Sequence, residues 1–140
     1  MARRAANVFL DTLALHGVDQ FFCVPGESYL GFLDALYDDP KIRSVTCRHE
    51  GGAGFMAVAD ARLTGRAGLA AVSRGPGATN ASIAVHLANQ DAVPLVLLVG
   101  QVARGEDAGD VHRGLAGLRL EVADVVHVEH ALEQSGVRFV

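Results

Sequence analysis

Short strand-like runs occur at four places along the chain, and each is bounded by residues that favour turns. They read QFFCV, RSVTC, GLAAVS and LVLLV, at residues 20–24, 43–47, 68–73 and 95–99. Mainly apolar runs, in place of a strict apolar–polar alternation, are typical of strands that are buried on both faces of a sheet. The pattern therefore predicts four buried strands.

Segments with helical spacing separate these runs. In the first of them, Ala5, Val8, Phe9 and Leu13 share one helical face, and Gly17 is a residue that ends helices. The predicted helices span residues 3–16, 29–37, 51–63 and 81–89. This alternation of strand, turn and helix predicts an α/β fold with a doubly wound parallel sheet and helices on both faces.

Composition and charge narrow the class of protein. The 140 residues are half hydrophobic, carry a net charge of −4 and contain no tryptophan. No cluster of basic residues is present, which argues against nucleic-acid binding. The longest apolar run, residues 92–100, is too short to span a bilayer, and the N-terminal segment lacks a signal-peptide core. We therefore expect a cytoplasmic domain with no membrane partner, in which Cys23 and Cys47 are reduced and buried.

Three turn segments follow the first three predicted strands. They read VPGES at residues 24–28, RHEGG at residues 48–52 and RGPGATN at residues 74–80. In parallel sheets, ligands bind outside the carboxyl ends of the strands. The three segments are therefore expected to form one composite site.

Glu50 is the candidate catalytic residue of this site. An acid at this position also suits the first turn of a helix, where the helix dipole favours negative charge. The functional interpretation is a carboxyl group that shares a proton with a bound ligand. Gly51 and Gly52 support it, because they leave room for a flat ligand beside the acid.

The two other segments have structural interpretations of their own. Thr79 or Asn80 could cap the following helix, and Glu27 or Ser28 could do the same after the first strand. A phosphate loop is poorly supported, because no Gly-Lys-Ser/Thr follows the glycines. The histidines lack the spacing of metal ligands, so we expect no metal site formed by this chain alone.

Two long stretches resemble the pyrimidine-binding domain of thiamine-diphosphate enzymes, in the acetolactate synthase-like and 2-oxo acid decarboxylase-like group. They are GVDQFFCVPGESYLGFLDAL, residues 17–36, and the stretch from CRHEGG to VGQV, residues 47–102. The resemblance covers residues 4–105 and includes several motifs in the same order and spacing.

The resemblance implies a role for each segment. Glu50 stands where the family's glutamate bonds the ring nitrogen of the aminopyrimidine and favours its imino tautomer. The exocyclic nitrogen of that ring then takes the proton from the thiazolium carbon. His86 and Gln90 correspond to positions that face a subunit interface. The implied cofactor-binding residues are Pro25, Gly26, Glu50, Gly75, Pro76, Gly77, Thr79, Asn80, His86 and Gln90.

The family's second domain holds magnesium and the diphosphate through a Gly-Asp-Gly motif, which this chain lacks. Here Gly109 and Asp110 are followed by Val111. We therefore expect the chain to bind only the pyrimidine end of thiamine diphosphate. Magnesium would be held by a partner domain or subunit in a homo- or hetero-oligomer, with a 2-oxo acid as substrate. The chain alone is not expected to be active.

Residues 106–140 fit the family poorly. A frameshift near residues 106–109 would explain this, so we divide the chain into a pyrimidine-binding domain at 1–105 and a divergent tail at 106–140. The last strand and helix of the fold would then be missing or altered, and apolar surface would be exposed. Two alternatives stay open: a non-catalytic regulatory or binding domain that retains the fold, and a nucleotide-binding α/β domain.

Overall fold

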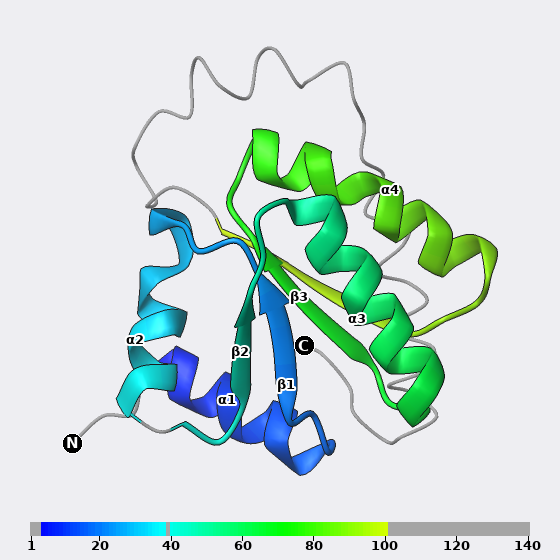
Figure 1. The fold of residues 1–140 in the computed structure, drawn as a ribbon. Coiled ribbons are helices and arrows are strands. Elements are labelled where there is room, and N and C mark those ends of the chain that lie inside the picture. Colours follow the sequence, from blue (N-terminus) through cyan, green and yellow to red (C-terminus); the bar gives the residue numbers. More distant parts are fainter. Residues whose placement is uncertain (1–3, 39, 101–140) are drawn as a thin grey trace.

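The computed structural model describes residues 4–38 and 40–100, which form layers of helices around a sheet (Figure 1). The elements are α1 (Ala5–Leu15), β1 (Gln20–Cys23), the 3₁₀ turn η1 (Glu27–Tyr29), α2 (Leu30–Asp38), β2 (Arg43–Thr46), α3 (Glu50–Thr64), β3 (Gly68–Val72), α4 (Pro76–Gln90) and β4 (Leu95–Val99). No helix in this part of the chain is both long and apolar enough to cross a membrane. The tail at 106–140, with the expected loss of the last strand and helix, lies outside the described residues.

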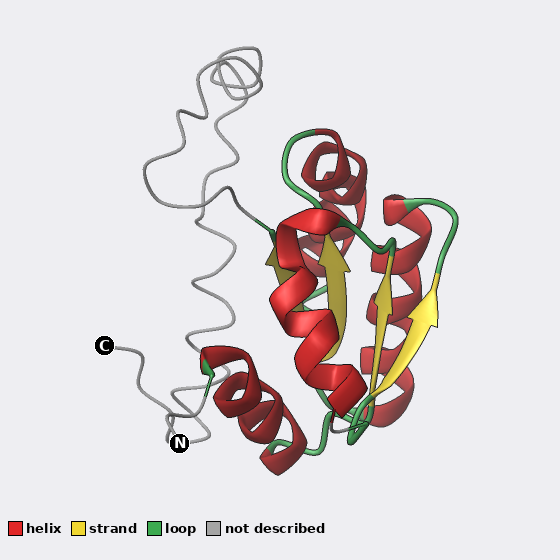
Figure 2. Ribbon diagram, turned by 90° about the vertical axis from the view of Figure 1, so that its left-hand side faces the viewer, coloured by secondary structure: helices red, strands yellow, loops and turns green. Residues whose placement is uncertain are grey.

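The described strands form one parallel sheet in the order β2-β1-β3-β4. β1 pairs with β2 from Gln20↔Arg43 to Cys23↔Thr46, and β3 pairs with β4 along its whole length. In the turned view of Figure 2 the arrowheads of the strands point the same way. The predicted doubly wound parallel sheet is confirmed.

Each face of the sheet has its own apolar core, because successive strand residues point to opposite faces. Phe21 and Cys23 of β1 pack with buried residues of α1 and α2, among them Leu10 and Phe32. Phe22, on the other face, packs in a cluster with buried alanines of α3. Helices α1 and α2 therefore cover one face, and α3 with α4 beside it covers the other (Figure 1).

The strand order creates a switch point between β1 and β3. The chain leaves β1 for α2 on one face, whereas it leaves β3 for α4 on the other face. Connections that diverge in this way mark the edge where open α/β sheets bind ligands. The segments after β1 and β3 are the predicted VPGES and RGPGATN turns.

Helix α4 begins at Pro76, five residues before the predicted start at residue 81. Gly75 is its N-cap, at a positive φ of 63° that disfavours other residues, and Pro76 occupies the first turn, where the missing N–H costs nothing. The expectation that Thr79 or Asn80 caps this helix is therefore wrong, because both lie inside it. Likewise, no side chain caps η1 after Gly26.

Helices α3 and α4 lie against each other through small residues. A Cβ atom at Gly54 would lie only 2.4 Å from the Cβ atom of Ala84. A Cβ atom at Gly51 would lie 3.1 Å from the carbonyl oxygen of Asn80. The glycines of α3 therefore allow the two backbones to approach closely.

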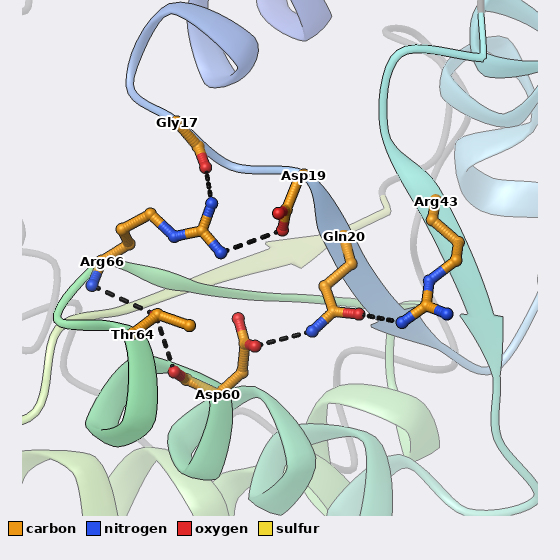
Figure 3. Close-up of polar contacts among 7 residues, drawn as sticks. All are labelled: Gly17, Asp19, Gln20, Arg43, Asp60, Thr64 and Arg66. Carbon is orange, nitrogen blue, oxygen red and sulfur yellow. Dashed lines mark hydrogen bonds and ion pairs between the residues drawn. The ribbon is translucent and has the colours of Figure 1, made fainter.

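Polar side chains connect the elements at the opposite, amino-terminal edge of the sheet (Figure 3). Arg66, just before β3, donates to the carbonyl oxygen of Gly17 and to Asp19 Oδ1, the latter at 3.0 Å. Gln20 donates to Asp60 Oδ1 at 2.6 Å. This network fixes the edge of the sheet that lies away from the predicted site.

Candidate active site at the carboxyl edge of the sheet

The structure brings the three predicted turn segments together. A Cβ atom at Gly26, after β1, would lie 3.1 Å from the Cβ atom of Ser73, after β3. A Cβ atom at Gly77 would lie 2.7 Å from Ser73 Oγ and 3.5 Å from Glu50 Oε1. Gly26, Ser73, Gly77 and Glu50 therefore adjoin one another in one composite surface, in which Gly77 is buried, although they come from three separate connections.

Glu50 is the first residue of α3. His49 caps the helix, because its Nδ1 atom accepts a hydrogen bond from the backbone N–H of Gly51 at 3.1 Å. Glu50 Oε2 accepts a hydrogen bond from Asn80 Nδ2 at 3.0 Å. Glu50 is half-buried in this chain, so the described residues alone do not enclose the acid in a dry pocket.

The two glycines beside the acid have different environments. Gly51 is buried against α4, where a side chain would meet the Asn80 carbonyl oxygen and the His49 ring. Gly52 has no atom within 4 Å of the position that a Cβ atom would take. The expectation of free space beside Glu50 therefore applies to Gly52, whereas Gly51 serves the contact between the helices.

Tyr29 supports the Pro25–Gly26 turn from below, a role that sequence reasoning missed. Its hydroxyl donates to the carbonyl oxygen of Val24 and lies 3.4 Å from the carbonyl oxygen of Ala71 in β3. Its ring lies 3.5 Å from the position of a Cβ atom at Gly26. Burial raises the pKa of this phenol, and the charge of Glu50 contributes as a smaller cause. A tyrosine at the start of a predicted helix carries no signal of this long-range contact.

The RGPGATN segment contributes Gly77 and Asn80 to the surroundings of Glu50. Thr79 instead donates its hydroxyl to the Gly75 carbonyl oxygen at 3.1 Å, a bond within the first turn of α4. Arg74 Nη2 lies 3.4 Å from Glu27 Oε1, so this pair joins the segments after β1 and β3 at their exposed side. Pro25 and Pro76 are exposed.

His86 and Gln90 lie on the exposed side of α4, away from Glu50. At about 1.5 Å per residue, they follow Pro76 by roughly 15 and 21 Å along the helix axis. Within this chain, the structure therefore does not bring them to the composite surface. Among the described residues, no group of His, Cys, Asp and Glu is arranged to hold a metal ion.

The family described as "Thiamine pyrophosphate enzyme, N-terminal TPP binding domain" matches residues 3–137. The chain belongs to this family. The match includes the three segments of the composite surface, and the family description implies thiamine diphosphate as the cofactor. It also continues past residue 105, where we placed the end of the domain.

Acetolactate synthases are among the similar proteins. The protein from Mycobacterium bovis is 42% identical over 100 residues, which cover 71% of this chain and 16% of that protein. The protein from Bacillus subtilis is 36% identical over 139 residues, which cover 92% of this chain and 24% of that protein. The chloroplastic protein from Arabidopsis thaliana is 34% identical over 142 residues, which cover 95% of this chain and 21% of that protein. The chain is thus a thiamine pyrophosphate-binding N-terminal domain of the acetolactate synthase-like kind, and it spans only a sixth to a quarter of these relatives.

Proposed function

We propose that this chain binds the aminopyrimidine end of thiamine diphosphate and forms half of an active site for decarboxylation or carboligation of 2-oxo acids. The observation that supports this most directly is the position of Glu50 Oε1, next to Gly77 at the switch point of the sheet. The names of the relatives, acetolactate synthases, support the class of reaction.

The residues around Glu50 suit a flat ring with a basic nitrogen. Gly52, two residues after the acid, has no atom within 4 Å of the position of a Cβ atom, so a planar group can approach this edge there. Glu50 holds or releases a proton at Oε1, opposite the ring nitrogen, because Oε2 is already engaged by Asn80. Pro25, Gly75, Pro76 and Thr79 shape the two turns beside the ring. When bound, thiamine diphosphate supplies the carbanion chemistry, while the protein positions it and exchanges its protons.

The diphosphate end requires a second domain. The described residues contain no cluster of metal ligands, and the relatives have four to six times the length that this chain covers. We propose that magnesium and the diphosphate are held by a partner domain or subunit. His86 and Gln90, on the exposed side of α4, would face that partner. The partner would also cover the half-buried Glu50 and exclude water from it.

Complementation with the missing domains tests this function. The chain is mixed with the remaining part of the Bacillus subtilis relative, and thiamine diphosphate binding with Mg²⁺ is measured by calorimetry, together with release of CO₂ from a 2-oxo acid. We expect binding and turnover only in the mixture. Glu50→Gln should reduce turnover by about 10²-fold or more, as for loss of a general acid–base group. Glu27→Gln is the matched control, since it removes a carboxylate from the same edge of the sheet and leaves Glu50 unchanged.

Other outcomes separate the alternatives. Cofactor binding without turnover in any mixture would favour a non-catalytic binding domain that retains the fold. Binding of ATP by the chain alone, unaffected by Glu50→Gln, would favour a nucleotide-binding domain. Equal turnover in the native chain and Glu50→Gln would refute the proposed role of the acid.

A further inference from the structure

The two carboxylate oxygens of Glu50 have different surroundings. Oε2 accepts a hydrogen bond from Asn80 Nδ2 at 3.0 Å. Oε1 lies 3.5 Å from the position of a Cβ atom at Gly77, beside Ser73. Among the described residues, Oε2 therefore has a hydrogen-bond donor from α4, whereas Oε1 lies beside Gly77 and Ser73 without a hydrogen bond.

Backbone packing between α3 and α4 holds Glu50 and Asn80 close to each other. Asn80 lies one turn into α4, and its carbonyl oxygen would be 3.1 Å from a Cβ atom at Gly51, the residue after Glu50. Further along, Gly54 of α3 packs directly on Ala84 of α4. The starts of the two helices are thus held together independently of the hydrogen bond between the side chains.

An amide nitrogen can only donate, so the oxygen that it meets must be an acceptor. The unprotonated oxygen of a carboxyl group is the better acceptor, so the hydrogen bond to Oε2 favours Oε1 as the place of a proton carried by Glu50. The Glu50 side chain has three rotatable bonds and is only half-buried, so without this bond its carboxyl group would be free to turn. Asn80 thereby selects which oxygen exchanges a proton with a ligand.

We propose that Asn80 is a positioning residue, which orients Glu50 so that Oε1 meets the ring nitrogen of the bound pyrimidine, and which does not itself contact the cofactor. This inference rests on the proposed function. It differs from the direct cofactor contact that the family resemblance implies for Asn80.

Two small ring compounds test the inference on the chain itself. The probes are 4-amino-2-methylpyrimidine and 2-amino-6-methylpyridine, which has a C–H group in place of the ring nitrogen opposite Glu50. Affinities are measured by ligand-observed NMR, at a pH where neither free ring is protonated. The native chain should prefer the pyrimidine, and Glu50→Gln should lose that preference.

Asn80→Ala should weaken pyrimidine binding about tenfold, in line with a hydrogen bond to a charged group, and leave pyridine binding unchanged. Asn89→Ala is the matched control, an exposed asparagine near the other end of the same helix. It should keep the native preference. Circular dichroism of each variant checks that α4 remains folded.

The outcomes distinguish the two proposals. If Asn80→Ala weakens binding of both rings equally, Asn80 acts through direct contact or general structure, and the positioning role is refuted. The positioning role is also refuted if Asn80→Ala still prefers the pyrimidine over the pyridine as strongly as the native chain, while Glu50→Gln loses that preference. In that case the proposed function of Glu50 survives. If the native chain shows no preference for the ring nitrogen, pyrimidine recognition by Glu50 is refuted, and the positioning role with it.

Discussion

The contact between α3 and α4 allows one substitution to be predicted in detail. Gly54→Ala would place a methyl carbon 2.4 Å from the Cβ atom of Ala84. Unstrained carbon contacts are about 3.5–4 Å, so the helices would have to separate by roughly 1 Å at this point. Because Glu50 and Asn80 begin these helices, the same contact determines the geometry of the candidate site.

Whether Gly54→Ala raises or lowers the free energy of unfolding depends on two opposing contributions. Overpacking a core costs about 1–3 kcal/mol, whereas replacing glycine with alanine inside a helix gains about 0.8–1 kcal/mol. Gly52→Ala makes the same chemical change in the same helix where no atom lies within 4 Å, so it should gain about 0.4–1 kcal/mol. Because the gain from helix propensity largely cancels, the two variants should differ by about 1–3 kcal/mol, with Gly54→Ala the less stable.

Urea unfolding followed by far-ultraviolet circular dichroism measures this difference. Tryptophan fluorescence is not an option, because the chain has no tryptophan. The double variant Gly54→Ala/Ala84→Gly removes the methyl group that the new side chain would meet. It should be more stable than the sum of the single effects by about 0.5–3 kcal/mol, the usual range of coupling between contacting residues.

Equal stabilisation by Gly54→Ala and Gly52→Ala would refute the close approach of the helices. An additive double variant would refute the specific contact between Gly54 and Ala84. A change in the urea m-value would instead show that the substitution altered the compactness of the native or unfolded state.

The remaining predictions concern the site, both edges of the sheet and the tail. Gly77→Ala should weaken binding of the aminopyrimidine probe, because its Cβ atom would lie 2.7 Å from Ser73 Oγ; unchanged affinity by NMR would contradict this. Burial raises the pKa of Tyr29 above its ordinary 10.0, so the folded state favours the neutral phenol. The resulting stabilisation is present below about pH 10 and is lost as the pH rises further, and Tyr29→Phe should lose less stability than the native chain in urea unfolding across that range. Arg66→Ala should cost about 1 kcal/mol in urea unfolding, because it removes the bonds to the Gly17 carbonyl oxygen and to Asp19; an unchanged midpoint would show that water replaces them. The frameshift expected near residues 106–109 predicts that the shifted reading frame continues into a diphosphate-binding domain, which sequencing of the DNA would settle.

Local sequence patterns predicted the helices and strands well where one interaction dominates. The strand predicted at residues 95–99 has the same bounds as β4, since Pro94 and Gly100 limit the apolar run to the length of a strand. The start of α4 was placed too late because Thr79 and Asn80 look like capping residues. The N-cap is Gly75, whose backbone conformation carries no side-chain signal of its own. Such a cap becomes visible only in the dihedral angles of the folded chain.

The sequence alone determined the α/β class, the three segments at the carboxyl ends of the strands, and Glu50 as the acid among them. Those features depend on periodicity and on residue type, which are local. Only the tertiary structure decided that Gly51 faces α4, that Asn80 holds one oxygen of Glu50, and that Tyr29 supports the Pro25–Gly26 turn. Two of these contacts join residues about thirty positions apart, Gly51 with Asn80 and Glu50 with Asn80. They exist because α3 and α4 pack side by side on one face of the sheet, and no pattern within either helix specifies which of its residues will meet the other.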